Sequence, residues 1–392
     1  MLLLAAIWAT FALIRGQGEI RKLIETGRLL EARELVRQKL AEDPSSSAWL
    51  YWKAAIAFAS GDLADAERTL QPVVGSQTAS GPHLLLLGEI HDRKQQWREA
   101  ARAYRRAMAF PHGSDLLIRL AQSEYRAGNP QAVVETLQPL AGSPEATGEA
   151  HFLLALSHGR QGDLEQSVAH LAKAVEKQPD VATYRFQFAL ALGESGDLER
   201  AVQELRRTLV LEPNLALAHF YLGQILHNMN LRDDALAALQ RADRLQPGIP
   251  NLAYSLGLLY KLQGDYDKAI MKLESQIASG SDHPAAHFHL AEILFRRNQT
   301  RRSGELIKRA IELQPGTADF HLLATEIALS AGRLEEAEAQ VGAAVDSDPN
   351  SGRAHYLRGR VLQAMGRDQE AGSAFEFSRK LMDGRREGAP AP

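Results

Sequence analysis

The chain has 392 residues, and its 45 Lys and Arg against 48 Asp and Glu give a formal net charge of −3. Hydrophobic residues make up 45% of it and charged residues 24%, proportions that exclude wholesale disorder. The balanced charge argues against a nucleic-acid-binding protein, which usually has a basic excess. The absence of cysteine excludes disulfides, thiolate metal sites and cysteine nucleophiles.

Residues 1–14 carry no charged side chain, and Arg15 ends this apolar stretch. At about 1.5 Å per residue, a helix of this length is too short for the roughly 30 Å hydrocarbon core of a bilayer. Three interpretations follow: an export signal or anchor whose upstream part is missing, a short membrane-embedded anchor, or a cover for the first folded repeat. Because the end of a repeat array normally presents a polar face, the first two are favoured. They favour an extracytoplasmic or membrane-tethered location over a cytoplasmic one.

Residues 13–385 repeat a turn residue every 34 positions, with a single interval of 33. A fixed period of this length is the sequence signature of a repeat architecture. Asn, the next-best residue after Gly for a positive φ, replaces Gly at two of the turns, but Gln95 has no such preference. We therefore expect a different turn geometry in the third repeat. The eleven turn residues are Gly27, Gly61, Gln95, Gly128, Gly162, Gly196, Asn230, Gly264, Asn298, Gly332 and Gly366.

The pattern predicts two helices in each repeat. In the sixth repeat, Thr183–Glu194 and Leu198–Leu211 each place apolar residues on one helical face. Gly196 between them can adopt the left-handed conformation of a helix end, and Asp197 can cap the helix that follows. Pro213 then stops the second helix. The Gly-Asp pair recurs at 61–62, 162–163 and 264–265, and a closing Pro recurs at Pro44, Pro179, Pro247, Pro315 and Pro349.

A helix–turn–helix unit of 34 residues with small residues at its closest helix contacts resembles the tetratricopeptide repeat. The family has Leu followed by Gly or Ala in the first helix, which is matched at Leu87-Gly88, Leu154-Ala155, Leu222-Gly223, Leu256-Gly257 and Leu290-Ala291. Its alanine after the turn is matched at Ala32, Ala66, Ala100, Ala201, Ala235, Ala269, Ala337 and Ala371, and its later alanine at Ala107, Ala174, Ala242, Ala310 and Ala344. Small residues are needed there because two helix backbones approach closely. Ser167, Ser303 and Val133 depart from the pattern.

This resemblance implies an all-α fold, a right-handed superhelical solenoid of about eleven repeats over residues 15–385, with the first helices on the concave surface and the second helices on the convex one. No linker interrupts the period, so we expect one repeat domain. Residues 386–392 lack large apolar side chains and are predicted to form a disordered tail.

The fifth position of successive repeats is aromatic and is predicted to lie at the edge of the buried stripe, facing partly into the concave groove. We expect these rings to be half-exposed anchors for an extended peptide. An alternative, which does not exclude the first, is that each ring packs on the first helix of the neighbouring repeat. The row consists of Phe152, Phe186, Phe220, Tyr254 and Phe288, with Tyr51 and Tyr356 in outlying repeats.

Arg93, Arg126 and Arg160 occupy the thirteenth position of three successive repeats and form a short basic row. A solvated face explains this row, and contact with an acidic segment of a partner is the sharper alternative. We include these arginines with the aromatic row as candidate residues of a partner-binding groove.

Four histidines share one repeat position, and we expect them to be half-buried packing side chains. Two repeats separate each from the next, which is too far for a shared metal ion: His151, His219, His287 and His355. The cluster of His283, His287 and His289 is closer, but His287 and His289 would point about 200° apart on a helix. We therefore expect no metal site.

The sequence contains no phosphate-binding loop and no nucleophile elbow. We therefore expect neither enzyme activity nor a cofactor. The leading hypothesis is a non-catalytic scaffold that binds an extended segment of a protein or peptide partner in the concave groove, with no nucleic-acid partner. The alternatives are an accessory specificity or assembly module of a separate enzyme or exopolysaccharide export machine, and a transient peptide-binding chaperone.

Overall fold

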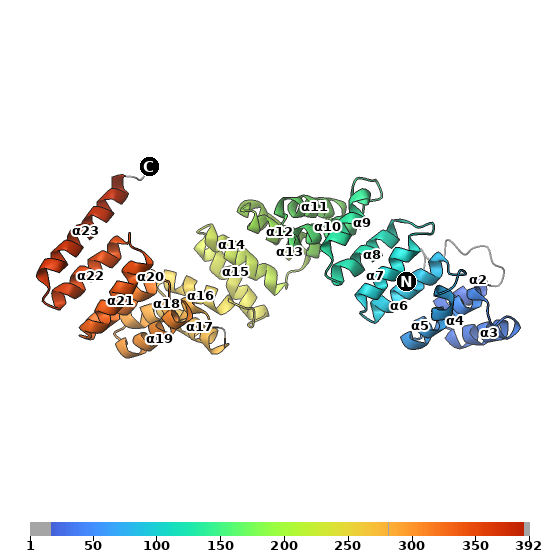
Figure 1. Ribbon diagram of the computed structural model, residues 1–392, viewed down its shortest axis with the longest axis horizontal. Helices are drawn as coiled ribbons and strands as arrows, with labels where there is room; N and C mark the ends of the chain where they lie inside the picture. The colour runs from blue at the N-terminus through green and yellow to red at the C-terminus, as the bar shows by residue number, and fades with distance from the viewer. Residues whose placement is uncertain (1–16, 281, 388–392) are drawn as a thin grey trace. The chain divides into compact units, whose positions relative to one another are not determined.

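The computed structural model describes residues 17–280 and 282–387, and all regular secondary structure in those two ranges is α-helical (Figure 1). The chain divides into two compact units, residues 1–212 and residues 213–392. In each unit, the two helices of a repeat pack against each other, and the second helix of a repeat packs against the first helix of the next repeat in the same unit. The all-α fold of stacked helix pairs is confirmed.

The described residues of unit 1 form six helix pairs, in which α2 is the shortest helix. Their bounds are α2 Gln17–Glu25, α3 Leu29–Glu42, α4 Ser47–Ala59, α5 Leu63–Val74, α6 Gly81–Arg93, α7 Trp97–Ala107, α8 Ser114–Arg126, α9 Pro130–Ala141, α10 Gly148–Arg160, α11 Leu164–Lys177, α12 Ala182–Glu194 and α13 Leu198–Leu211. The last pair agrees with the predicted helices of the sixth repeat to within one residue.

In unit 2, the residues that the structure describes form five helix pairs, of which the last helix is the longest. Their bounds are α14 Ala216–Asn228, α15 Arg232–Leu245, α16 Leu252–Gln263, α17 Tyr266–Ala278, α18 Pro284–Arg296, α19 Thr300–Leu313, α20 Ala318–Ser330, α21 Leu334–Ser347, α22 Gly352–Ala364 and α23 Asp368–Glu387. Helix α23 therefore continues two residues past the predicted end of the repeats at 385. Residues 388–392, the rest of the predicted tail, lie outside the described residues, as do residues 1–14.

All eleven predicted turn residues have a positive φ, so the turn register is confirmed along the whole array. The expectation of a different third turn is wrong, because Gln95 has a φ of 58°, close to the 61° of Asn230. A side chain with Cβ is disfavoured in this region but not forbidden, and ten other turns of one geometry fix the path of the eleventh.

Aspartates after the turn cap the second helices, as predicted. In the sixth repeat, Asp197 accepts a hydrogen bond from the backbone N–H of Arg200. The same cap stands in three other repeats, where the aspartates are Asp62, Asp163 and Asp265. The cap satisfies one of the backbone donors that a helix N-terminus leaves free.

Small residues lie where the two helices of a repeat come closest. Ala201 and Ala235 are fully buried on the second helices. A Cβ atom added to Gly223 would lie 2.6 Å from the side chain of Leu239 and 3.1 Å from the carbonyl oxygen of Ala235. Larger side chains at these positions would force the helices apart, so the packing role expected of the small residues is confirmed.

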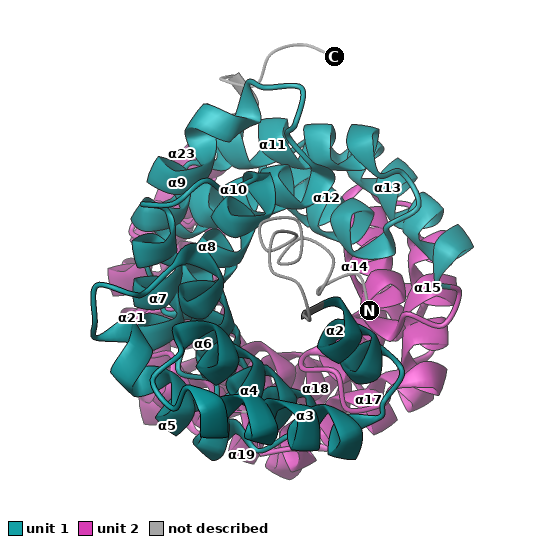
Figure 2. Cartoon of the chain, turned by 90° about the vertical axis from the view of Figure 1, so that its right-hand side faces the viewer, with its two compact units in different colours: residues 1–212 teal, residues 213–392 magenta. Residues whose placement is uncertain are grey.

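The two helices of each repeat lie on different sides of unit 1. Figure 2 shows α4, α6, α8, α10 and α12 on its inner side, while α5, α7, α9, α11 and α13 form its outer side. The first helices therefore form the inner surface of unit 1, where a binding groove would lie.

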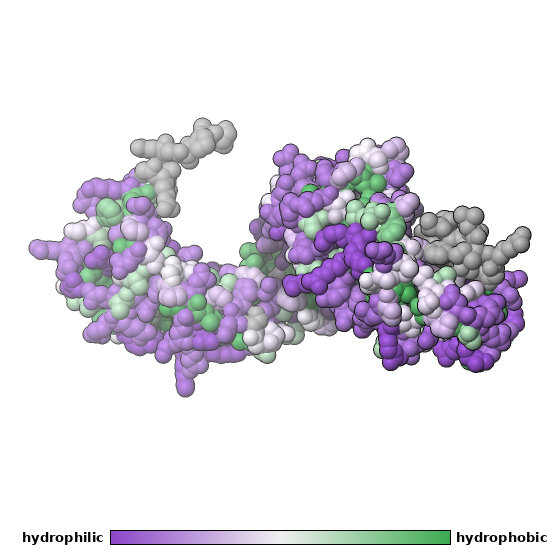
Figure 3. Space-filling model, turned by 45° about the vertical axis from the view of Figure 1, so that its right-hand side comes forward, coloured by the Kyte–Doolittle hydropathy of each residue, from purple (hydrophilic) through white to green (hydrophobic). Residues whose placement is uncertain are grey.

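On the face drawn in Figure 3, hydrophilic side chains dominate the surface and hydrophobic ones show as small patches between them.

Candidate functional site

The predicted basic row lies at the ends of three successive first helices of unit 1. Arg93 is the last residue of α6, Arg126 the last of α8 and Arg160 the last of α10. All three side chains are exposed. A cation at a helix C-terminus is favoured by the partial negative charge of the free carbonyl groups there. We call these three residues the arginine row.

Each member of the arginine row stacks on an aromatic ring of the preceding repeat. The guanidinium carbon lies 5.1 Å from the ring centre of Phe58 for Arg93, 4.8 Å from that of Trp97 for Arg126, and 3.8 Å from that of Tyr125 for Arg160. These distances fall within the range of a cation–π contact. The stacking orients each cation without neutralising it. These rings were not predicted as partners of the arginines, although an aromatic residue 29 to 35 positions before each Arg was a visible signal in the sequence.

No carboxylate among the described residues pairs with the arginine row. The ion pairs found in unit 1 use other cations, so that Glu89, one helical turn before Arg93, lies 3.2 Å from Arg119 instead. Burial raises the pKa of Glu89 to about 7, a shift that the charge of Arg119 opposes and that the charge of Arg93, which forms no ion pair with Glu89, opposes more weakly. Arg160 donates one hydrogen bond, from Nη1 to the Tyr125 carbonyl oxygen at 3.0 Å. The row therefore presents three oriented cations that keep their charge available.

Unit 2 has one arginine at the same repeat position, and its environment is different. Arg296, the last residue of α18, lies 3.1 Å from Glu292, one turn earlier on the same helix. Glu292 also pairs with Lys261 of α16, whose ammonium lies 3.0 Å from Nδ1 of His289. Hydrogen bonds from His289 and from Lys261 lower the pKa of Glu292 to about 2. The charges on this part of unit 2 thus neutralise one another.

The aromatic row is not uniformly half-exposed, and the expectation is wrong for three of its members. Phe186 is 9% exposed and Phe220 is 6% exposed, which places both rings in the core. Tyr51, in an outlying repeat, is buried as well. A side chain at the edge of an apolar stripe can point toward the core or toward the solvent, and in these repeats the ring points toward the core.

The other rings of the row keep some exposed surface. Phe152 stacks on Tyr184 of the next first helix with ring centres 4.6 Å apart, and Phe288 stacks on Phe320 in the same way at 5.0 Å. Tyr254 lies 4.1 Å from the ring centre of His283. This is the predicted packing on the neighbouring first helix. Tyr356 is the most exposed, at 48%.

The histidine position is structural. His219 Nε2 lies 3.0 Å from the carbonyl oxygen of Pro213, and His355 Nε2 lies 2.9 Å from that of Pro349. These contacts tie the start of a first helix to the closing Pro of the preceding repeat. His321, which was not among the predicted histidines, holds the same position and makes the same contact with Pro315 at 2.7 Å. His151, His287 and His355 are buried rather than half-buried, so that expectation holds only for His219.

His151 belongs to a cluster of three histidines between α10 and α11. Its Nδ1 lies 3.1 Å from Nδ1 of His170, and His170 stacks on His158 with ring centres 5.5 Å apart. Burial, together with the neighbouring His151 and His158, lowers the pKa of His170 to about 4. In the part of the chain that the structure describes, no three His, Asp or Glu side chains are placed to hold a metal ion. None of the described helices has the length and apolar character to cross a membrane.

Solved structures resemble this chain in fold. The C-terminal part of a TPR repeat-containing protein from Cytophaga hutchinsonii is 16% identical, with 61% of this chain and 98% of that one covered and a TM-score of 0.51. PilF of Pseudomonas aeruginosa is 19% identical, with 54% and 97% covered and a TM-score of 0.49. A chain of the APC/C hetero-tetramer Cut9-Hcn1 is 12% identical, with 92% and 99% covered and a TM-score of 0.49. No curated protein matches the chain.

Three family models match the sequence, and all three are described as tetratricopeptide repeat. The first matches residues 23–87, 261–327 and 299–361, the second 118–182, 186–250 and 228–282, and the third 84–112. Together they run from residue 23 to residue 361 with only two short gaps, and they agree with the period, the turns and the helix pairs seen in the structure. The chain belongs to the tetratricopeptide repeat family.

Proposed function

We propose that this protein is a non-catalytic scaffold whose unit 1 binds an extended acidic segment of a protein partner along the ends of the first helices. Tetratricopeptide repeats imply a protein–protein interaction scaffold. The single observation that carries the finer proposal is the arginine row, which consists of three exposed cations in three successive repeats, each oriented by an aromatic ring and none ion-paired within the described residues.

The period of the repeat explains why the partner segment would be extended. Arg93, Arg126 and Arg160 hold one position on consecutive repeats, so a ligand that meets all three must run from repeat to repeat along the stack. An extended chain does so with few contacts in each repeat.

Charge is the expected source of both selectivity and rate. An isolated exposed ion pair contributes only about 0.2–1 kcal/mol, so no single arginine would dominate the affinity. Three cations of one sign on one edge steer an acidic segment toward the surface and disfavour basic competitors. Stacking also lowers the conformational entropy that each arginine side chain loses on binding, because it is already held over a ring.

Chemical crosslinking followed by affinity capture with the full-length chain tests this proposal. The variant Arg93→Gln/Arg126→Gln/Arg160→Gln removes the row. The control is Arg37→Gln/Arg68→Gln/Arg102→Gln, which changes the net charge equally at three exposed arginines of unit 1 that pair with Glu34, Asp65 and Glu99. We expect the row variant, and not the control, to lose partners with acidic crosslinked segments. Capture of one set of partners by all three proteins would refute the proposal.

A further inference from the structure

The outer side of unit 1 carries a second group of arginines, all on helix α7. Arg98, Arg102 and Arg106 follow one another at every fourth residue, so they lie about 6 Å apart along the helix axis and within about 80° around it. All three side chains are exposed, and Figure 2 places α7 on the outer side of unit 1. We call these three residues the α7 stripe.

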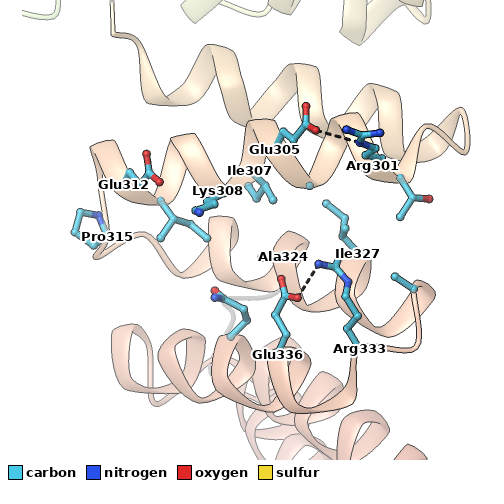
Figure 4. A pocket seen from close by; sticks show the side chains of 15 residues that line it. Arg301, Glu305, Ile307, Lys308, Glu312, Pro315, Ala324, Ile327, Arg333 and Glu336 are labelled. Atoms are coloured by element: carbon cyan, nitrogen blue, oxygen red, sulfur yellow. Dashed lines mark hydrogen bonds and ion pairs between the residues drawn. The ribbon is translucent and has the colours of Figure 1, made fainter.

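No other second helix has this arrangement. The α7 stripe occupies the third, seventh and eleventh positions after the turn residue, and in the other ten repeats these positions hold at most two arginines or lysines. Helix α19 comes nearest with Arg301 and Arg309, but Glu305 holds the position between them and pairs with Arg301 at 3.3 Å (Figure 4). Arg309 pairs with Asp282 at 3.1 Å. A stripe made of cations alone is therefore particular to α7.

The cations of the α7 stripe keep most of their charge available. Arg98 has neither an ion pair nor a hydrogen bond among the described residues. Arg106 donates from Nη2 to the Val74 carbonyl oxygen at 2.6 Å. Arg102 lies 4.0 Å from Glu99, a distance at which an exposed ion pair contributes little. The carboxylates of neighbouring helices have other partners, in the pairs Asp65 with Arg68, Glu67 with Lys94, Glu124 with Arg105, and Glu135 with Gln131.

The outward face of α7 suits a charged surface better than a protein partner. Every exposed residue of α7 is charged, and Glu99 is the only acidic one. A protein interface usually buries an apolar or aromatic centre, which this face lacks. Anionic lipid headgroups need no such centre, because each arginine near a membrane surface is attracted by its charge alone. The outer side of unit 1 can also approach a flat bilayer more closely than its inner side can.

We propose that the α7 stripe binds the anionic phospholipid headgroups of a membrane surface. Residues 1–14, in the same unit, supply a second argument, since this apolar stretch is too short to span a bilayer. A weak apolar anchor holds a protein stably only with a second signal, such as a basic patch. The α7 stripe provides that patch. It lies on another helix than the arginine row and does not rest on the function proposed above.

Flotation of the purified full-length chain with lipid vesicles tests this site. One set of vesicles is phosphatidylcholine, which has no net charge, and the other is equal parts of phosphatidylcholine and phosphatidylglycerol. The measured quantity is the ratio of the two partition coefficients, anionic over neutral. Attachment that does not depend on lipid charge cancels in this ratio.

Two variants remove charge from the stripe, and one control removes it elsewhere. Arg98→Gln/Arg102→Gln/Arg106→Gln is the stripe variant. The double variant Arg98→Gln/Arg102→Gln leaves the Arg106 contact with Val74 in place, so that contact cannot explain its behaviour. The control, Arg301→Gln/Arg302→Gln/Arg309→Gln, removes as much charge as the stripe variant from a second helix whose three arginines are all ion-paired.

We expect the parent and the α19 control to prefer the anionic vesicles and the stripe variant to lose at least about tenfold of that preference. The double variant should lose an intermediate part of it. Salt should weaken the preference of the parent, because it screens exposed charges. Substitution of the arginine row should leave the ratio unchanged, which separates the two proposals.

Three results would overturn the membrane site. The first is the same ratio for the parent and the stripe variant. The second is an equal loss in the α19 control or in the arginine-row variant, which would make net charge the cause rather than the stripe. The third is a parent without preference for anionic vesicles that binds a short oligoglutamate peptide which the stripe variant does not bind. That result would make an acidic protein segment the occupant.

Discussion

Arg160 stacks its guanidinium 3.8 Å above the ring centre of Tyr125 and donates from Nη1 to the carbonyl oxygen of the same residue at 3.0 Å. Tyr125 belongs to α8 and Arg160 to α10, so the contact joins two repeats. Two interactions with one residue fix the direction of the cation, and neither neutralises it. Arg93 and Arg126 share the stacking but not the hydrogen bond, and stacking without an ion pair distinguishes the arginine row from the many exposed arginines that face a carboxylate.

The packing glycines and the open glycines should respond oppositely to substitution by alanine. We expect Gly223→Ala to destabilise the protein by about 1–3 kcal/mol, because the new methyl group meets Leu239 and the Ala235 carbonyl. Gly342→Ala, inside helix α21 with open space around it, should stabilise by about 0.5–1 kcal/mol because alanine loses less backbone entropy. Urea unfolding of the three proteins measures both differences. A change in the free energy of unfolding with the same sign for both variants would contradict the packing described for these two glycines.

The aromatic row predicts a contrast between a buried and an exposed ring. Phe220→Ala should cost about 3–5 kcal/mol, through lost transfer free energy and a cavity, because the ring is 6% exposed. Tyr356→Ala should cost about 1 kcal/mol or less, because nearly half of that side chain is already in water. Chemical unfolding checks the order. A small loss of stability for Phe220→Ala would contradict its burial and would indicate that this ring is a binding anchor in the groove.

The buried histidine cluster predicts a loss of stability in acid. Because burial lowers the pKa of His170 to about 4, below the value near 6.5 of an unfolded chain, protonation favours unfolding. The contribution of His170 to the free energy of unfolding is fully present above about pH 6.5 and falls as the pH drops toward 4. The expected loss from this residue is about 2 kcal/mol between pH 7 and pH 5. His170→Gln should remove that part of the slope.

Glutamine is the matched replacement, since Gln340 holds the same repeat position and its Oε1 lies 2.8 Å from Nδ1 of His321. Burial, together with the charges of Lys173 and Lys177, also lowers the pKa of His151, so its protonation favours unfolding as well. The raised pKa of Glu89 opposes the trend, because protonation of that carboxyl favours the folded state. These other groups are the same in the parent and the variant, so their effects cancel in the difference between the two free energies of unfolding at each pH. Parallel pH profiles for the two proteins would show that the cluster does not titrate as described.

Residues 1–14 predict membrane association of the full-length protein, since the stretch is apolar and uncharged. Cell fractionation should place the intact chain with membranes, and deletion of residues 1–14 should release it. Salt washing of the membranes separates this attachment from charge-driven binding, which salt screens. Recovery of the intact chain in the soluble cytosolic fraction alone would contradict this interpretation.

Much of the fold could be predicted from the sequence because the same local pattern of turn and helix residues occurs in eleven successive repeats. The turns at Gly196 and Asn230, the cap at Asp197 and the stop at Pro213 each depend on a few neighbouring residues, and the period fixes their register. Gln95 shows where local preference fails, since the turn geometry is imposed on it by the array rather than by its own propensity.

The candidate site could be predicted only in part, because it depends on contacts between repeats. The positions of Arg93, Arg126 and Arg160 followed from the period, but their stacking depends on which aromatic residue the preceding repeat supplies. The exposure of Phe152 against the burial of Phe186 likewise depends on the packing of neighbouring helices.

The most direct test of the account is a titration of an acidic peptide against the arginine row. The probe is a fluorescein-labelled extended peptide taken from a crosslinked partner segment, and fluorescence anisotropy gives its Kd for the full-length chain at several salt concentrations. Arg93→Gln/Arg126→Gln/Arg160→Gln should weaken binding at least about tenfold and flatten the salt dependence, while the Arg37, Arg68 and Arg102 control should do neither. Equal affinity of the parent and the row variant, with both fully folded, would contradict it.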